Sequence, residues 1–170
     1  MIEIRPPKKE DLKIMWEYIN DISQEKTFIR FQGEEISQEE EQQYLTAQLE
    51  KIKKHLAVQL MLLIDGKLVG LSGIDLGDKI EKHVGLFGIT IHKDFRGKGL
   101  GSKLMEAVIN EAVKNLSQLE IIILAVYEEN ELAKQMYEKF GFVEYGNLPK
   151  GIKRASEYSN HIFMYKVVKG

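Results

Sequence analysis

The stretch Gly88-Ile-Thr-Ile-His-Lys-Asp-Phe-Arg-Gly-Lys-Gly-Leu-Gly101 decides the fold of this chain. A β-branched apolar run ends in three glycines at alternate positions, and apolar residues then recur at steps of three and four as far as Leu116. This pattern predicts a strand, a glycine-rich turn and an amphipathic helix. Glycines allow the chain to turn sharply and allow a ligand to approach the backbone closely.

The start of that helix is a predicted anion site. N–H groups of the turn and of the first helical turn have no partner within the helix, and the helix dipole adds positive charge there. Arg96 and Lys98 bring two full charges. A phosphate or pyrophosphate is therefore the expected ligand. The alternative is a plain glycine-rich turn that binds no ligand. The spacing Gly-x-Gly-x-Gly fits neither the dinucleotide fingerprint nor the P-loop.

Two motifs in this sequence resemble those of one enzyme superfamily. Arg96-Gly-Lys-Gly-Leu-Gly101 resembles the Arg/Gln-x-x-Gly-x-Gly/Ala acetyl-CoA loop of the Gcn5-related N-acetyltransferases (GNAT). Downstream, Asn130-x-x-Ala133-x-x-x-Tyr137-x-x-x-Gly141-Phe142 resembles the second half of the same pattern. The resemblance covers residues 67–145 firmly and both ends loosely. It implies a single α/β domain over residues 1–170, with a mixed, mostly antiparallel sheet and a splayed central parallel strand pair flanked by helices.

The resemblance also implies how the donor, acetyl-CoA, is bound. Backbone groups hold the two parts of the molecule, and an N–H of the central strand polarises the thioester carbonyl. These backbone groups belong to Ile89, Thr90 and Ile91 for the pantetheine arm, and to Arg96, Gly97, Lys98, Gly99, Leu100, Gly101 and Ser102 for the pyrophosphate. Asn130 contacts the pantetheine arm and also begins a helix as its N-cap. The side chains of Ile89 and Ile91 can be core residues at the same time.

Tyr137 is the predicted catalytic residue. It follows Asn130 by seven residues and so lies on nearly the same helical face. A phenol with a reference pKa of about 10 stays protonated at neutral pH and can donate its proton to the departing thiolate. The alternative is a core aromatic residue at helical spacing. Three residues are candidates for the base that takes the amine proton, and none is assigned: Asp75, His83 and Glu157.

Composition narrows the function classes. The 24 basic and 26 acidic residues nearly balance, so neither nucleic acid nor a membrane surface is an expected partner. Cysteine is absent, which excludes disulfides, a cysteine nucleophile and thiolate metal sites. Four histidines show no ligand spacing, so no metal is expected. With no apolar run of membrane-spanning length and no leader pattern, a cytoplasmic enzyme is expected.

The remaining elements follow from periodicity and turn chemistry. Asp11 is expected to cap a first helix, and Ser37 with Glu40 a second helix whose residues 39–41 form a solvated first turn. Tyr44, Leu45, Leu49 and Ile52 are expected to face inward in that helix. Predicted strands are Ile2–Arg5, Ala57–Ile64, Lys67–Leu76, Val84–Ile91, 119–127, 142–145 and 162–168. Segments 23–36 and 146–160 are expected to be loops, and whether they form the acceptor site is left open.

The predicted function is direct transfer of an acetyl group from acetyl-CoA to a primary amine of a small molecule or amino acid. One alternative is a protein N-terminal or lysine acetyltransferase, and another is an acetyl-CoA-binding sensor without turnover. A nucleotide-binding domain is a third alternative. A homodimer is expected, because the apolar final strand 162–168 could pair through its edge with a second copy.

Overall fold

The computed structural model describes residues 1–169. Over those residues the chain forms one sheet of seven strands in the order β1-β2-β3-β4-β5-β7-β6, with four α-helices. The strands are β1 Ile2–Arg5, β2 Ala57–Ile64, β3 Lys67–Leu76, β4 Val84–Ile91, β5 Ile121–Tyr127, β6 Val143–Arg154 and β7 Glu157–Val167. The helices are α1 Leu12–Gln24, α2 Gln38–Lys53, α3 Leu100–Asn115 and α4 Glu131–Lys139, with short 3-10 helices η1 Lys9–Asp11, η2 Lys79–Glu81 and η3 Lys93–Phe95.

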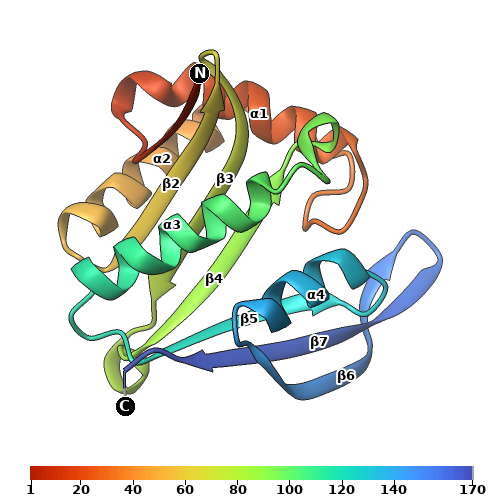
Figure 1. The fold of residues 1–170 in the computed structure, drawn as a ribbon. Helices are drawn as coiled ribbons and strands as arrows, with labels where there is room; N and C mark the ends of the chain where they lie inside the picture. Colours follow the sequence, from red (N-terminus) through yellow and green to blue (C-terminus); the bar gives the residue numbers. More distant parts are fainter. Residues whose placement is uncertain (170) are drawn as a thin grey trace.

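Strands β4 and β5 form the parallel pair, and they diverge along their length. Their pairing runs from Val84–Ile121 to Leu86–Ile123 and ends there. Figure 1 shows β4 and β5 starting together near the C-terminus and separating toward their carboxyl ends. Every other pairing in the sheet is antiparallel. The predicted mixed sheet with a splayed central pair is confirmed.

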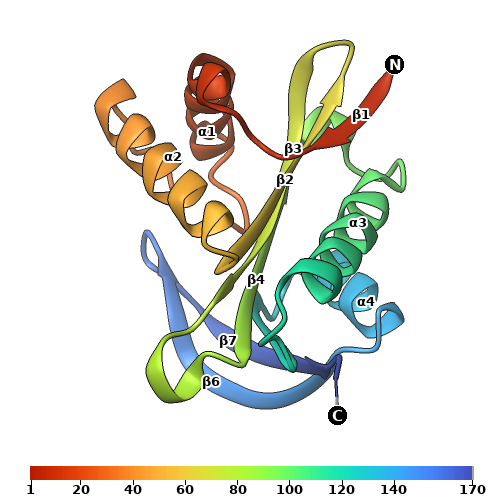
Figure 2. The same cartoon turned by 90° about the vertical axis from the view of Figure 1, so that its left-hand side faces the viewer.

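The helices cover the sheet on both faces. In Figure 2, α1 and α2 lie on one face, and α3 and α4 lie on the other. The larger core lies under α3, where Leu104, Met105 and Val108 are fully buried against the sheet. A smaller core joins α1 and α2 to β2 and β3 through Met15 and Met61. No helix within residues 1–169 combines the length and the apolar character needed to cross a membrane.

Local signals place several boundaries correctly. The Asp65-Gly66 turn has φ values of +50° and +82°, as a two-residue hairpin turn requires. Ser37 caps α2 by accepting a hydrogen bond from the Glu40 N–H at 3.2 Å, while the Glu40 carboxylate accepts from the Ser37 N–H at 2.8 Å. Asn130 caps α4 through a bond from the Ala133 N–H at 3.3 Å.

Three expectations about the first two helices are wrong. The Asp11 carboxylate does not cap α1, because it accepts bonds from the Arg5 guanidinium at 2.6 and 2.8 Å and from the Lys8 N–H. Glu41 is not solvated: it is 6% exposed, since its position on α2 turns toward the sheet. Tyr44 in contrast is 44% exposed.

Residues 146–160 form a hairpin rather than a loop. Strands β6 and β7 pair from Val143–Tyr165 to Arg154–Glu157 around a turn at residues 155 and 156. The outer half of this ribbon pairs with no other strand and is mostly exposed, so no apolar alternation marks it. The predicted free edge of strand 162–168 is also wrong, because β7 lies between β5 and β6. The free edge in this part of the sheet belongs to β6.

Candidate active site

The glycine loop lies between β4 and α3 and turns as the sequence predicts. Gly97 and Gly99 have φ values of +71° and +73°, which L side chains rarely adopt. A Cβ added at either residue would meet no atom within 4 Å, so the space above the loop is open. Gly99 is the N-cap of α3, so the N–H groups from Leu100 to Ser102 lack partners in the helix and point toward that space. The residues present therefore fit a pyrophosphate bound by backbone groups.

The two basic side chains of the loop face its own backbone. The Arg96 Nε donates to the Ile91 carbonyl at 2.7 Å, and its guanidinium pairs with the buried carboxylate of Glu25. Glu25 also accepts a bond from the Lys93 N–H at 2.9 Å. The Lys98 Nζ donates to the Asp94 carbonyl at 2.8 Å. These charges hold the loop in shape, and no local pattern indicated that Glu25 would join it to the end of α1.

Beyond Leu86, strand β4 has no partner on the β5 side. Ile89, Thr90 and Ile91 lie in this unpaired part, with their other edge bonded to β3. Ile89 and Ile91 pack against the larger core, as expected for residues that act through their backbone. The Thr90 hydroxyl lies 2.9 Å from the Tyr18 hydroxyl of α1. An extended ligand arm can therefore pair with β4 at this opening, as an added strand does.

Tyr137 stands beside the opening, on the face that carries α3 and α4. Its ring is 7% exposed and packs edge-on against Phe87 at 6.0 Å between centroids, with Phe142 at 6.2 Å. Phe87 is the first β4 residue past the last paired position. Burial raises the pKa of Tyr137 to about 12, so the phenol remains protonated. Within residues 1–169 no group accepts a hydrogen bond from its hydroxyl, which leaves that proton available.

The opposite face of the opening brings three distant segments together. Phe28 from the loop after α1 contacts Tyr127 at the end of β5, with ring centroids 5.5 Å apart. The Tyr127 hydroxyl donates to the Ile29 carbonyl at 2.9 Å. The Arg154 guanidinium, from the end of β6, lies 5.1 Å from the centre of the Phe28 ring and 5.6 Å from that of Tyr127. A cation thus stacks on two aromatic rings next to the opening.

The three candidate bases do not lie together at the opening between β4 and β5. Asp75 neighbours Leu86 in the sheet, but its carboxylate binds the Lys51 ammonium at 2.6 Å and the Gln48 amide at 2.8 Å. Glu157 lies at the tip of the β6–β7 hairpin, opposite Arg154. None of these placements leaves a free carboxylate at the opening.

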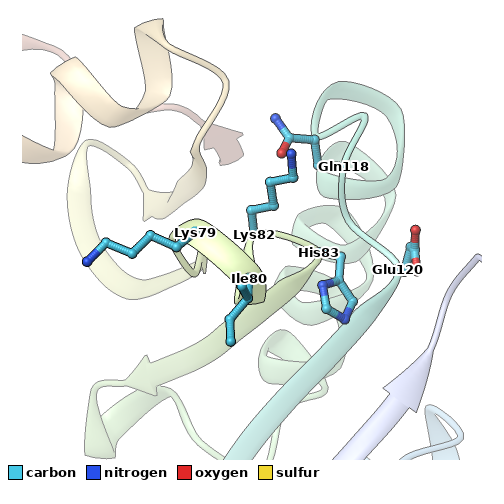
Figure 3. A pocket seen from close by; sticks show the side chains of 6 residues that line it. All are labelled: Lys79, Ile80, Lys82, His83, Gln118 and Glu120. Atoms are coloured by element: carbon cyan, nitrogen blue, oxygen red, sulfur yellow. The ribbon is translucent and has the colours of Figure 1, made fainter.

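His83 precedes β4, at the end of the strand pair opposite the glycine loop. It lines a surface pocket of about 390 Å³ with Lys82, Gln118 and Glu120. Figure 3 shows His83 between the η2 turn and the start of β5. Because β4 and β5 are paired at this end, this pocket is separate from the opening.

Sequence reasoning missed a buried polar group beneath α2. Glu41 and Gln59 are 6% and 5% exposed, and the Gln59 amide donates to the Tyr44 hydroxyl at 2.6 Å. Burial raises the pKa of Glu41 to about 7. The helical spacing of Glu41 from Leu45 and Gln48 is the signal that could have placed it on the buried face.

Comparison with known proteins agrees with this architecture. The profile of the acetyltransferase (GNAT) family matches residues 16–142. The protein named L-amino acid N-acetyltransferase AaaT of Escherichia coli is 34% identical over 110 residues, which are 64% of this chain and 67% of that protein. The spermine/spermidine N(1)-acetyltransferase of Bacillus subtilis is 32% identical over 92 residues, 51% of this chain and 60% of that protein.

Solved structures show the same fold over nearly the whole chain. The crystal structure of a GNAT-family acetyltransferase from Streptococcus pneumoniae has a TM-score of 0.90 and 26% identity, and covers 99% of this chain and 100% of that one. The structure of yncA, a putative acetyltransferase from Salmonella typhimurium with acetyl-CoA, has a TM-score of 0.85 and 16% identity. The match covers 100% of this chain and 95% of that one. By its family match and its fold, this chain belongs to the acetyltransferase (GNAT) family.

Proposed function

We propose that this N-acetyltransferase moves an acetyl group directly from acetyl-CoA to the primary amine of a small molecule, with a free amino acid as the preferred acceptor. The observation that carries this proposal is the opening between β4 and β5. It has an anion-binding helix start at one end and a free phenol at its side. These two features support donor binding and protonation of the leaving group at this opening.

Donor binding relies on backbone groups. The N–H groups from Gly97 to Ser102 would hold the pyrophosphate, and the unpaired edge of β4 at Ile89, Thr90 and Ile91 would pair with the pantetheine arm. An N–H of that edge would polarise the thioester carbonyl. Acetyl-CoA itself supplies the activated acyl group. Asn130, the N-cap of α4, would contact the pantetheine arm from the other side.

Tyr137 would give its proton to the sulfur as the carbon–sulfur bond breaks, and water would then restore the phenol. The acceptor nitrogen must lose two protons in the same cycle: an ammonium loses one before it attacks, and the nitrogen loses the second as the amide forms, which balances the proton given to the sulfur. Deprotonating an α-amine with a reference pKa near 7.7–8.0 costs less than about 1 kcal/mol of free energy at pH 7.4. Deprotonating a lysine amine with a reference pKa near 10.4 costs roughly 4 kcal/mol.

Asp75 is bound to Lys51 and Gln48, and the carboxylate of Glu129, which interacts electrostatically with Arg154, accepts a hydrogen bond from the Ser159 hydroxyl. With no carboxylate assigned as the base, an α-amine suits this site better than a lysine side chain.

Arg154 supports an amino acid as the acceptor. Its guanidinium stacks on Phe28 and Tyr127 beside the opening. Within residues 1–169 it forms no ion pair at 4.0 Å or less, although the charge of Glu129 interacts with it at longer range. A guanidinium binds a carboxylate in a two-pronged fashion, so the α-carboxylate of an amino acid fits here. The name of the Escherichia coli relative points the same way, whereas the Bacillus relative is named for polyamines.

The test is a comparison of L-norleucine with pentylamine, which is the same molecule without its carboxylate. We expect Arg154→Met to raise the KM for norleucine at least tenfold, with kcat little changed and pentylamine unaffected. Lys153→Met is the matched control, because Lys153 lies next to Arg154 and stacks on Tyr158 instead. Equal effects of both variants, or an equal loss with both amines, would refute the role of Arg154.

Two other readings of the same site have their own signatures. A protein N-terminal acetyltransferase would release CoA with peptides but not with free amino acids. A sensor domain would bind acetyl-CoA and release no CoA with any amine. We also propose that the protein forms a homodimer. We propose a cytoplasmic location, because the donor is an intracellular metabolite, and an activity that requires neither a metal nor nucleic acid.

A further inference from the structure

Next to the opening, one face of the sheet carries apolar side chains that α1 and α2 leave uncovered. Thr90 points to the α1 side of β4, since its hydroxyl contacts that of Tyr18. Strand alternation places Gly88 and Leu86 on that same side. Leu86 pairs with Ile123, which brings the side chain of Ile123 onto this face of β5. The two helices pack on β2 and β3 (Figure 1), and Leu86 is 57% exposed, so a ligand can reach this face.

Aromatic rings form a wall on the far side of this face. On β7, Tyr165 lies opposite Ile123, and Phe163 lies opposite Ala125. Residues that are directly opposite in an antiparallel pair share a face of the sheet. Tyr145 of β6 packs against both rings, with its centroid 6.2 Å from that of Phe163 and 5.8 Å from that of Tyr165. Three rings from two strands therefore form one continuous apolar wall.

Small residues lie between this wall and β4. Ala125 is exposed, and a Cβ built on Gly88 would meet no atom within 4 Å. Each of them follows the last β4–β5 pair, Leu86–Ile123, by two residues, so they lie at the same level on either side of the opening. An acceptor has room above these two residues, with its amine at the opening and its side chain toward the wall.

Arg154 limits the direction in which an amino acid can lie here. Its guanidinium stacks on Tyr127, which is two residues beyond Ala125 on the same face of β5. Two residues along a strand span roughly 7 Å. With its carboxylate on Arg154, an amino acid can therefore extend a long side chain over Ala125 to the ring of Phe163.

The same arginine favours a small ligand over a second copy of the chain. The Arg154 guanidinium lies 5.1 Å from the centre of the Phe28 ring, so the β6–β7 hairpin and the segment after α1 meet at this end of the face. A flat protein surface could not lie against this end without breaking that contact. An amino acid is small enough to bind beside it.

We propose that Ala125, Phe163 and Tyr165 form a subsite for the acceptor's side chain, so that the preferred acceptors are amino acids with a large apolar or aromatic side chain. This inference rests on the proposed function, in which the α-amine lies at the opening and the α-carboxylate lies on Arg154. A benzyl side chain on these rings removes apolar surface from water. A charged side chain in the same place would lose hydration and gain no partner of opposite charge.

The experiment compares L-phenylalanine, L-alanine and L-lysine by the rate of CoA release, with mass spectrometry of the product. We expect kcat/KM for phenylalanine to exceed that for alanine at least tenfold, with the acetyl group on the α-nitrogen. Lysine has a long side chain with a charged end, so its kcat/KM should not exceed that of alanine. This third substrate separates an apolar subsite from one that only accepts length.

Two variants test the residues of the subsite. Ala125→Leu fills the space beside the opening, and Phe163→Ala removes the central ring of the wall. Each should lower the ratio of kcat/KM for phenylalanine to that for alanine at least fivefold. Because this ratio cancels any loss common to both acceptors, a change in donor binding does not alter it. Ala47→Leu, on the exposed face of α2, is the matched control and should leave the ratio unchanged.

The outcomes separate the subsite from the proposed function. Equal kcat/KM for phenylalanine and alanine, or for phenylalanine and lysine, would overturn the subsite and leave the proposed function standing. A ratio that Ala125→Leu leaves unchanged while light scattering shows an altered oligomeric state would also overturn it, because a second copy would then cover this face. CoA release with none of the amino acids would overturn the proposed function and the subsite together.

Discussion

The ring and the hydroxyl of Tyr137 have separate tasks. Because the ring packs against Phe87 and Phe142, Tyr137→Phe should keep the fold and change stability by less than about 1 kcal/mol. Acetyl-CoA affinity should also change little. The rate of acetyl transfer should fall by roughly 10²–10⁴, the usual contribution of a positioned proton donor. Single-turnover rates against pH, measured with saturating acceptor, check this prediction.

Tyr18 provides the control, since its hydroxyl is bonded to Thr90 on the other face of β4. Tyr18→Phe should lose stability without a comparable loss of rate. If Tyr137→Phe keeps wild-type single-turnover rates at every pH, Tyr137 is a core residue and has no part in the chemistry.

Glu41 should make the stability of the protein depend on pH. Its folded pKa is about 7, above the ordinary 4.5, so the folded state holds its proton where the unfolded state releases it. Stability is therefore fully present below pH 4.5 and falls as pH rises through 7, by about 3 kcal/mol. Glu41→Gln should remove this fall, as measured by urea unfolding between about pH 5 and pH 8. Glu39→Gln, exposed in the same turn, should leave it in place, and identical profiles for both variants would contradict the assignment.

Single residues differ in how well the sequence places them. Asn130 and Ser37 were predicted correctly because a cap is a local interaction with a residue three positions away. The partner of Arg96 and the burial of Glu41 were not predicted, because both depend on distant parts of the chain. Arg96 meets Glu25 from 71 positions away, and Glu41 is buried by a sheet that no local pattern reveals.

At the scale of elements, the glycine loop offers a matched pair of substitutions. Gly99 and Gly66 both have a left-handed φ, and a Cβ at either meets nothing within 4 Å. Asparagine tolerates this backbone conformation, so Gly99→Asn and Gly66→Asn should cost similar stability. Gly99→Asn should weaken acetyl-CoA binding at least tenfold, or about 1.4 kcal/mol, because its side chain occupies the phosphate space.

Calorimetry with both folded variants decides this prediction. Gly66 lies in the β2–β3 turn, far from the loop in sequence, and its substitution should leave the affinity unchanged. An unchanged affinity in Gly99→Asn would remove the loop from donor binding.

Elements with a buried face were predictable, and those without one were not. Strands β2, β3 and β4 were predicted with the observed bounds, because each has a tight turn or an apolar run to mark it. The β6–β7 hairpin was read as a loop, since it exposes both faces beyond β5 and has no apolar period. The parallel pair and its splay came from family resemblance, because strand order leaves no periodic signal in a sequence.

At the scale of the whole molecule, the free edge of the sheet is β6. It exposes Val143, Tyr145 and Leu148, each more than half exposed, and such an apolar edge favours association with a second copy. We predict a dimer at micromolar concentration by light scattering. Tyr145→Lys should shift it toward the monomer, while Tyr158→Lys, at the hairpin tip, should not. A monomeric wild-type protein would contradict this prediction.

The central claim is that the opening between β4 and β5 catalyses acetyl transfer to an amine rather than only binding acetyl-CoA. The most direct measurement is the release of free CoA from acetyl-CoA, monitored by detection of its thiol. It is made with and without a panel of amino acids, polyamines and short peptides. The account predicts CoA release only when an amine is present, with an amino acid acetylated at its α-nitrogen as the product by mass spectrometry. Tight binding of acetyl-CoA with no CoA release in the presence of any amine would contradict it.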